Sequence, residues 1–334
     1  MWHVGMDWHS RQTSLTVRDS HGRKLYSRHV RGGVDAVVRE LCKLKGPFSV
    51  TFEASTGYGH VYDEIAKVAH TVRVAHPGHL RLIFRSKRKS DRVDSDKMSK
   101  LDYLDEVPQV HVPGREVRSW RRTITYRNRM VMERTSTKCR IRAFLRSLGI
   151  AAPRGLWTRA GIAWLAGLEF EVELDAIVRD EFVERLGHLD ALVKRVTKAL
   201  DRKARANPAV QLLMTIPGVG PRTAEAVVAW VDDVKRFSSV RKVADYFGVV
   251  PCLDQSANAA HYGHITREGP AVVRRLLVEA THQSIRRSAK VMAYCERIRR
   301  DDPDRKKIAI VATAHYLVRV MAAMLRTGEV WRDE

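Results

Sequence analysis

The sequence contains little cysteine and never groups it. Its four cysteines, Cys42, Cys139, Cys252 and Cys295, lie far apart and form no C-x-x-C pair. Zinc ribbons and secreted disulfide scaffolds need closely spaced cysteines, so this spacing argues against both classes. We expect the four residues to be buried free thiols. The histidines show no H-x-x-x-H spacing, so they do not indicate a metal site on a helix either.

The chain also lacks a long apolar run and a signal-peptide pattern. Met1-Trp2-His3 leads directly into a strand-like segment, whereas a secretory signal begins with a basic stretch that an apolar stretch follows. A membrane-spanning helix needs about 20 predominantly apolar residues. These absences predict a cytosolic protein that does not enter the membrane.

Negative charge is scarce in this sequence. The chain has 38 Asp and Glu residues and 60 Lys and Arg residues, which gives a formal net charge of +22. A monomer this basic repels itself, and a polyanionic partner would relieve the repulsion. Nucleic acid is the first candidate for that partner, and an anionic membrane surface is the second.

The N-terminal part of the chain predicts a mixed α/β sheet. The whole chain has 334 residues and is 44% hydrophobic, which allows two or three domains with cores of their own. Alternating and helical periodicities give the order β-β-β-α-β-α-β-α. The expected strands are 2–7, 14–17, 24–30, 48–53 and 71–75, and the expected helices are 34–43, 60–69 and one that carries 91–94.

Two carboxylates stand out on the helix after the fifth strand. Asp91 and Asp94 are three residues apart and project from one helix face, where they repel each other unless a cation lies between them. Taken alone, the pattern also fits a solvated helix face beside the basic run 87–89. Asp96 is a further carboxylate nearby, and it either assists or replaces Asp94 or stands outside the site.

Asp7 and Glu53 give these two carboxylates an expected meeting place. Asp7 ends the first strand and Glu53 ends the fourth. In an RNase H-like arrangement these strands are neighbours and the last helix crosses their ends, so all four carboxylates converge. Two Mg²⁺ ions about 3.5–4 Å apart, or Mn²⁺ in their place, would suit such oxygen ligands in phosphoryl transfer. Each residue alone also fits a turn cap or a surface ion pair, and His9 is either a contact of this site or a surface histidine.

The stretch 115–146 predicts a long basic helix. It holds eleven Lys and Arg residues against only Glu116 and Glu133, with Trp120 and Tyr126 among them. Such a helix favours a nucleic-acid contact in which arginines neutralise phosphates, although a solvated face is the alternative. The arginines that we select as contacts are Arg121, Arg122 and Arg129.

The middle of the chain predicts a helical linker. Residues 153–170 are expected to be a break and a short connection, and 171–200 to be a helix with an apolar 3–4 spacing. This helix forms a coiled-coil arm that pairs with another protomer or packs within its own chain. The expected domains are therefore 1–152, 153–206 and 207–334.

The last domain is expected to be mostly α-helical and to contain a helix-hairpin-helix at 212–224. Gly218 and Gly220 allow a tight turn, and the following helix start, with Arg222, can bind a backbone phosphate without reading sequence. A structural turn between packed helices is the alternative. Further helices are expected at 223–231, 240–247 and 270–287, with a loop at 248–258. Ser256 in that loop is by its chemistry an ordinary turn residue, because no adjacent base is visible.

Taken together, these motifs resemble the DEDD-type transposases of bacterial insertion sequences (the insertion-sequence-110 type), which are bridge-RNA-guided serine recombinases. The resemblance extends from Asp7 nearly to the C-terminus. The segments that carry it are Gly5-Met6-Asp7, 52–57 (FEASTG), 89–95 (KSDRVDS), 216–220 (IPGVG), the Ser256 loop, 263–269 (GHITREG) and 306–309 (KKIA).

The resemblance implies the following roles. Asp7, Glu53, Asp91 and Asp94 are the metal-binding tetrad of a RuvC-like domain, and Ser256 is the nucleophile that becomes covalently joined to a DNA end. A structured guide (bridge) RNA selects donor and target DNA by base pairing, and Arg267 is added to the expected nucleic-acid contacts. Sites are composite between protomers, so a homo-oligomer, a dimer or a tetramer, is expected in the bacterial cytoplasm at the nucleoid.

The sequence departs from the family pattern after Ser256. Many members have glycine there, whereas this chain has Ala257-Asn258, which reduces the freedom of the backbone. Two other functions remain open at this point. One is a RuvC-like metal-dependent nuclease or junction resolvase in which water attacks and Ser256 is structural. The other is a non-catalytic nucleic-acid-binding protein that uses only the basic helices and the hairpin.

Overall fold

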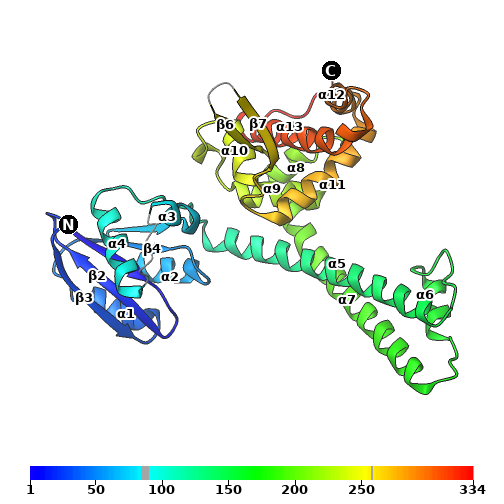
Figure 1. Cartoon of the computed structure of the whole chain (residues 1–334), viewed down its shortest axis with the longest axis horizontal. Helices are drawn as coiled ribbons and strands as arrows, with labels where there is room; N and C mark the ends of the chain where they lie inside the picture. Colours follow the sequence, from blue (N-terminus) through cyan, green and yellow to red (C-terminus); the bar gives the residue numbers. More distant parts are fainter. Residues whose placement is uncertain (84–89, 257–258, 334) are drawn as a thin grey trace. The chain divides into compact units, whose positions relative to one another are not determined.

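The computed structural model describes residues 1–83, 90–256 and 259–333. The chain divides into two compact units, Met1–Arg118 and Ser119–Glu334, and each is described here by itself (Figure 1). The expected domain boundaries after 152 and after 206 both fall inside the second unit. The basic run 87–89 and Ala257-Asn258 lie outside the described residues.

The first unit is built on one five-stranded mixed sheet. Its strand order is β3-β2-β1-β4-β5, with β1–β4 and β4–β5 parallel and the other pairs antiparallel. The strands are β1 (Trp2–Asp7), β2 (Gln12–Arg18), β3 (Lys24–Arg31), β4 (Phe48–Glu53) and β5 (Thr71–Ala75). The prediction of a mixed sheet whose first and fourth strands are neighbours is confirmed, and the arrangement agrees with an RNase H-like fold.

The two faces of this sheet differ in chemistry because side chains alternate along each strand. One face carries the apolar residues, including Val4, Met6, Val50 and Phe52, which pack against α1 (Val34–Leu41) and α2 (Tyr58–Ile65). The other face carries small or polar residues and is covered by α4 (Asp91–Tyr103), which contacts β1, β2 and β4. A short helix, α3 (Pro77–Ile83), follows β5.

Helix α4 lies directly on β1 because Gly5 has no side chain. A Cβ atom at Gly5 would lie 2.0 Å from the Ser95 carbonyl oxygen and 2.2 Å from the Ser99 nitrogen. Ser95 and Ser99 are themselves small and fully buried. The hydroxyl groups of Ser95 and Thr16 on β2 are 2.9 Å apart and hydrogen-bonded. Backbone therefore packs against backbone at this point.

A buried carboxylate fixes the far end of α4. Asp102 is 1% exposed and accepts hydrogen bonds from Thr51 Oγ1 at 2.6 Å and from Arg73 Nη1 at 2.9 Å. Its second oxygen contacts His3 Nδ1 at 2.7 Å and also accepts from Ser49. A buried charge needs such partners, and these partners lie on three different strands. The residue thereby sets how far along the sheet α4 is placed.

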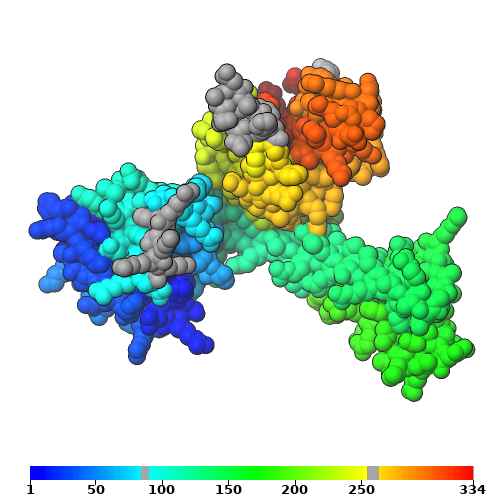
Figure 2. Space-filling view, viewed as in Figure 1, coloured from blue at the N-terminus to red at the C-terminus, as the bar shows by residue number. Residues whose placement is uncertain are grey.

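The second unit begins with an arm of two long antiparallel helices. These are α5 (Arg115–Ser147), which starts in the first unit, and α7 (Glu173–Ala206). Met130 on α5 packs with Leu189 and Val193 on α7, and Figure 2 shows the two helices against one another. Helix α7 thus packs within its own chain along this contact, and its pairing with another protomer stays a prediction. Residues 153–170 are more than a connection, because they contain α6 (Arg159–Ala166), whose Leu165 joins the core at that end.

The rest of the second unit is mostly helical, as expected. Its helices are α8 (Pro208–Leu213), α9 (Pro221–Val231), α10 (Val240–Phe247), α11 (Ala271–Arg287), α12 (Ala289–Arg299) and α13 (Lys306–Thr327). The expectation of a loop over 248–258 is wrong for most of its length. Residues Pro251–Ser256 form β6, which pairs with β7 (Ala259–Ile265).

Helix α13 corrects the statement that the chain has no long apolar run. The segment Pro303–Thr327 is long and apolar enough to cross a membrane by length and composition, with a mean hydropathy of 1.8. Its Leu317, Val318 and Met321 are fully buried in the core of the second unit. One side of α13 packs against α8, α10, α11 and α12, and a core helix of this kind can have the length and composition of a membrane span.

The expectation of buried thiols is also wrong. All four cysteines are free, but Cys42, Cys139 and Cys252 are exposed and only Cys295 is partly covered. The absence of disulfides agrees with their spacing in the sequence.

A buried ion cluster joins the arm to the helical core. Glu225 on α9 is 0% exposed and lies 3.2 Å from Arg222 Nη1, and Arg222 Nη2 donates to Asp201 on α7 at 2.6 Å. Burial raises the pKa of Glu225 to about 7, although Arg222 and Arg127 on α5 lower it. The burial cost outweighs the attraction at this site.

The contact at Gly5 gives the first prediction. We expect Gly5→Ala to destabilise the first unit by about 3 kcal/mol, the upper end for an overpacked site, because backbone atoms stand in the way. Hydrogen–deuterium exchange of the α4 peptide 91–103 should speed up in this variant. Gly33→Ala is the matched control, since a Cβ there meets nothing within 4 Å. Equal exchange in the two variants would contradict the packing argument.

The buried Glu225 gives a prediction on pH. Its ordinary pKa is 4.5 and its folded pKa is about 7, so between these values the folded state binds more protons than the unfolded state. The free energy of unfolding should therefore fall as pH rises from 4.5 to about 7. The loss should be on the order of 3 kcal/mol, at about 1.4 kcal/mol for each pKa unit.

Glu225→Gln should remove this dependence, and urea unfolding at pH 5 and pH 8 measures it. Glu184→Gln, on an exposed position of α7, is the control that should keep the slope. A slope that survives in Glu225→Gln would assign the pH dependence to other groups.

Candidate metal centre and nucleic-acid interface

Asp7 and Glu53 lie side by side at one edge of the sheet. Met6 on β1 is in register with Phe52 on β4, so the next residue of each parallel strand is its carboxylate. Side-chain alternation turns both residues away from the apolar core and toward the face that α4 covers. The carboxyl ends of these two strands therefore supply two of the four predicted acidic residues.

Helix α4 supplies the other two from its first turn. Ser90 caps the helix, with its hydroxyl accepting from the Val93 nitrogen at 3.4 Å, and Asp91 and Asp94 follow in the first turn. The free N–H groups and the helix dipole favour negative charge at this end. Because Asp102 at the other end contacts the starts of β1 and β4 through His3 and Ser49, the first turn reaches their carboxyl ends.

One open cavity collects all four carboxylates. It measures about 580 Å³ and is lined by Asp7, Trp8, His9, Ser10, Glu53, Ser55, Thr56, Asp91 and Asp94. The structure thus brings together every residue of the predicted tetrad. Their role as metal ligands stays a prediction.

The electrostatics of the cavity favour the binding of a cation. Partial burial raises the pKa of Asp7 above its ordinary value, and the neighbouring Asp91, Asp94 and Glu53 raise it further, while His9 lowers it. Four carboxylates that repel one another in a partly buried cavity are stabilised when a positive ion lies between them. Carboxylate oxygens are also the ligands that Mg²⁺ and Mn²⁺ accept. The donor set fits a divalent metal ion.

His9 lines this cavity, and its side chain is 61% exposed. Ligand atoms of Asp7, His9 and Asp91 all lie within 4.8 Å of one another. The His9 Nε2 atom is 3.6 Å from Asp7 Oδ2. The available signal in the sequence was its closeness to Asp7, at which β1 ends.

Asp96 does not line this cavity. Its Oδ1 atom accepts from Arg18 Nη2 at 2.9 Å and is 3.2 Å from Lys24 Nζ. Both partners lie on the antiparallel strands β2 and β3. Asp96 therefore ties α4 to β2 and β3.

Close backbone contacts fix the end of the β6–β7 hairpin that lies away from Ser256, where β6 begins and β7 ends. Gly248 follows α10, and a Cβ there would lie 2.4 Å from the Glu268 nitrogen, while one at Gly269 would lie 2.0 Å from the Tyr246 carbonyl oxygen. Arg274 on α11 donates to the Phe247 carbonyl at 3.2 Å. These contacts join the end of α10, residues 268–269 and helix α11 next to the start of the hairpin.

Ser256 is the last residue of β6 and pairs with Ala259 at the start of β7. It thereby lies at the end of the hairpin away from these contacts. Ala257 and Asn258, where the chain departs from the family pattern, lie outside the described residues.

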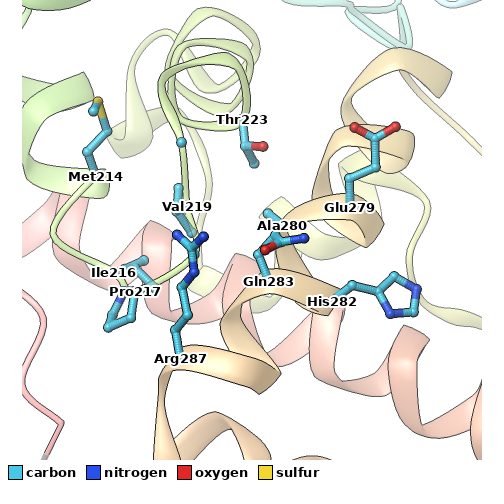
Figure 3. Close-up of a pocket in the computed structure, with 12 residues that line it drawn as sticks. Met214, Ile216, Pro217, Val219, Thr223, Glu279, Ala280, His282, Gln283 and Arg287 are labelled. Carbon is cyan, nitrogen blue, oxygen red and sulfur yellow. The ribbon is translucent and has the colours of Figure 1, made fainter. Parts of the chain in front are cut away.

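The turn between α8 and α9 borders a second groove of about 690 Å³. Gly218 has a φ of +90°, and a Cβ there would lie 2.4 Å from the Ser284 nitrogen, so this glycine permits close packing on α11. Gly220 caps α9 and is exposed. Figure 3 shows Arg287 extending from α11 toward the turn, on the same groove as Gln283.

The predicted arginine contacts fall into two groups. Arg121 donates to the carbonyl oxygens of Ala229 at 2.7 Å and Trp230 at 3.1 Å, and Arg222 is held in the buried ion cluster. Both guanidinium groups therefore hold helices of the second unit together. The other three, Arg122, Arg129 and Arg267, are exposed.

Comparison with protein families gives two matches from one group of transposases. Residues 4–150 match the DEDD transposase model of the IS110 type, and residues 210–296 match the transposase model described as the IS116/IS110/IS902 family. The first match contains the whole tetrad, and the second contains the α8–α9 turn, Ser256 and Arg267.

Individual relatives agree with these matches. A probable family 20 transposase of Pseudomonas aeruginosa is 24% identical, with 85% of this chain and 84% of the relative covered. The transposase for insertion sequence element IS1111A of Coxiella burnetii is 25% identical, with coverage of 85% and 78%. The transposase for insertion sequence element IS1328 of Yersinia enterocolitica is 24% identical, with coverage of 85% and 84%. The carboxylate cavity and the strand order agree with these matches. The chain therefore belongs to the IS110/IS116/IS902 family of insertion-sequence transposases.

Proposed function

We propose that this transposase cleaves and rejoins DNA strands through a covalent phosphoserine intermediate on Ser256, assisted by a metal ion at Asp7, Glu53, Asp91 and Asp94. The observation that carries the proposal is the convergence of these four carboxylates on one cavity at the carboxyl ends of β1 and β4. The family match supports the use of a divalent metal and of DNA as substrate.

The tetrad is proposed to hold Mg²⁺, with Mn²⁺ as the alternative. When bound, the ion polarises the scissile phosphate and stabilises the charge on the leaving oxygen. The protein's contribution is to bring four mutually repelling carboxylates into one partly buried cavity before the substrate arrives. Such preorganisation avoids rearrangement during the reaction.

The proposed strand transfer conserves the phosphodiester energy. The Ser256 hydroxyl oxygen attacks the scissile phosphorus, the new P–Oγ bond forms, and one P–O bond to a deoxyribose breaks. The serine proton ends on that deoxyribose oxygen, which becomes a free hydroxyl DNA end. A hydroxyl end of another strand then attacks the phosphoserine and releases the serine, so no net hydrolysis takes place.

Nucleic acid is proposed to bind through backbone contacts to the second unit. Arg122, Arg129 and Arg267 are exposed, and the groove beside Gly220 carries Arg287 on its other wall. With a net charge of +22 the chain can neutralise many phosphates. A structured bridge RNA would choose donor and target DNA by base pairing, so the protein itself needs few base contacts.

An oligomer, a dimer or a tetramer, is part of this proposal. Four apolar side chains at the start of α7 are exposed by 40% to 69%, namely Val172, Leu174, Ile177 and Val178. An exposed apolar patch of this kind is typical of an interface. A second protomer that covers it would allow the tetrad of one chain to serve Ser256 of another. The reaction is proposed to take place at the bacterial nucleoid.

A metal-dependent nuclease that uses water is the second candidate, because the tetrad cavity alone is sufficient for phosphodiester hydrolysis. In that case Ser256 has no chemical role, and the products are free DNA ends.

A denaturing gel separates the two candidates. Purified protein, Mg²⁺, the cognate RNA and labelled donor and target DNA should yield a protein–DNA adduct that resists denaturation. Ser256→Ala should abolish the adduct, because the attacking oxygen is removed, and Asp7→Asn should reduce it by at least about a hundredfold, because the metal site is disrupted. Ser238→Ala, at an exposed serine of the same unit, should keep the adduct.

Cleavage by wild type and Ser256→Ala alike, with no adduct, would contradict the phosphoserine mechanism and establish the nuclease. A mixture of Ser256→Ala and Asp7→Asn that regains the adduct would show that the two sites act between protomers. Omission of the RNA should abolish joining if the RNA guides the reaction.

A further inference from the structure

His9 lines the same cavity as Asp7, two residues beyond it in the chain. Trp8, between them, also lines the cavity and packs against the apolar core of the first unit. Because β1 ends at Asp7, His9 is placed by the turn that follows the strand. The His9 carbonyl accepts a hydrogen bond from Thr13 Oγ1 at 3.4 Å, which links the backbone of this turn to β2.

The imidazole of His9 is close enough to share an ion with two of the carboxylates. Ligand atoms of Asp7, His9 and Asp91 lie within 4.8 Å of one another, a separation that a single ion between them bridges with metal–ligand bonds of about 2.0–2.2 Å after small side-chain movements. The His9 side chain is 61% exposed, so its movement toward the ion meets little resistance. Asp7 and Asp91 come from β1 and α4, so the ion would also join these two elements.

Resting on the proposed function, we propose that His9 is a nitrogen ligand of the metal ion held by Asp7 and Asp91, and that it biases the centre toward a transition ion such as Mn²⁺. Mg²⁺ prefers oxygen ligands and retains its waters, whereas imidazole suits first-row transition ions. An all-carboxylate tetrad treats the two ions more evenly. The added nitrogen sets this chain's centre apart from a tetrad of oxygen ligands.

The simpler explanation of His9 is an ion pair with Asp7, whose oxygen lies 3.6 Å from Nε2. The two explanations differ in what the nitrogen contacts when metal is present. If His9 is a ligand, a bound ion replaces the ion pair and contacts the imidazole nitrogen directly. If His9 only pairs with Asp7, a bound ion leaves the imidazole in solvent. Pulsed electron paramagnetic resonance on Mn²⁺ detects a directly bound ¹⁴N nucleus and distinguishes them.

The test uses full-length protein loaded with Mn²⁺ alone. Wild type should show a ¹⁴N coupling typical of a bound imidazole, and His9→Ala should lose it while its Kd for Mn²⁺ rises by about tenfold or more. The Kd for Mg²⁺, measured by competition, should rise less. His60→Ala, at an exposed histidine on α2, is the matched control and should keep both the coupling and the affinity.

Three results would overturn the proposal. Mn²⁺ that binds in an Asp7-dependent manner without a ¹⁴N coupling would exclude His9 as a ligand and leave the proposed function intact. A coupling that persists in His9→Ala would assign the nitrogen to another group. Failure of wild type to bind either Mn²⁺ or Mg²⁺ would overturn both this proposal and the metal centre of the proposed function.

Discussion

The close approach of α4 to β1 at Gly5 is the contact on which the carboxylate cavity depends. Asp91 and Asp94 reach Asp7 and Glu53 only because the helix backbone lies directly on the strand, where a Cβ would come within 2.0 Å of Ser95. Two anchors then hold α4 in place along the sheet, since Asp102 binds partners on β1, β4 and β5 and Asp96 binds β2 and β3. One glycine and two structural carboxylates thus position the four carboxylates of the cavity.

The ionised side chain of Asp7 works against the stability that this packing provides. The raised pKa of Asp7 shows that its ionised form is disfavoured in the fold, first by burial and then by its acidic neighbours. Asp96 and Asp102 each form an ion pair with an arginine instead. Strain of this kind is characteristic of a site whose balancing charge arrives with a ligand. The proposed divalent cation would supply that charge here.

Much of the N-terminal unit and its tetrad could be predicted from the sequence, because strand order and two-residue alternation place Asp7 and Glu53 with few assumptions. The β6 strand was missed because the run from Pro251 to Ser256 shows no clear alternation of apolar and polar residues, and the contacts below it join Gly248 to Glu268 and Gly269 to Tyr246, about 20 residues apart. The internal roles of Arg121 and Arg222 were invisible for a related reason. Nothing in a basic run tells which guanidinium group meets a carbonyl or carboxylate of a distant helix.

Thermal unfolding with and without metal tests the central claim that the four carboxylates form one cation site. In chelator, Asp7→Asn should melt at a higher temperature than wild type, because a repelled charge is removed, and added Mg²⁺ should raise the Tm of wild type but not of the variant. Asp35→Asn, at an exposed residue of α1, should behave as wild type does. A lower Tm for Asp7→Asn in chelator, or an undiminished rise with Mg²⁺, would contradict the account.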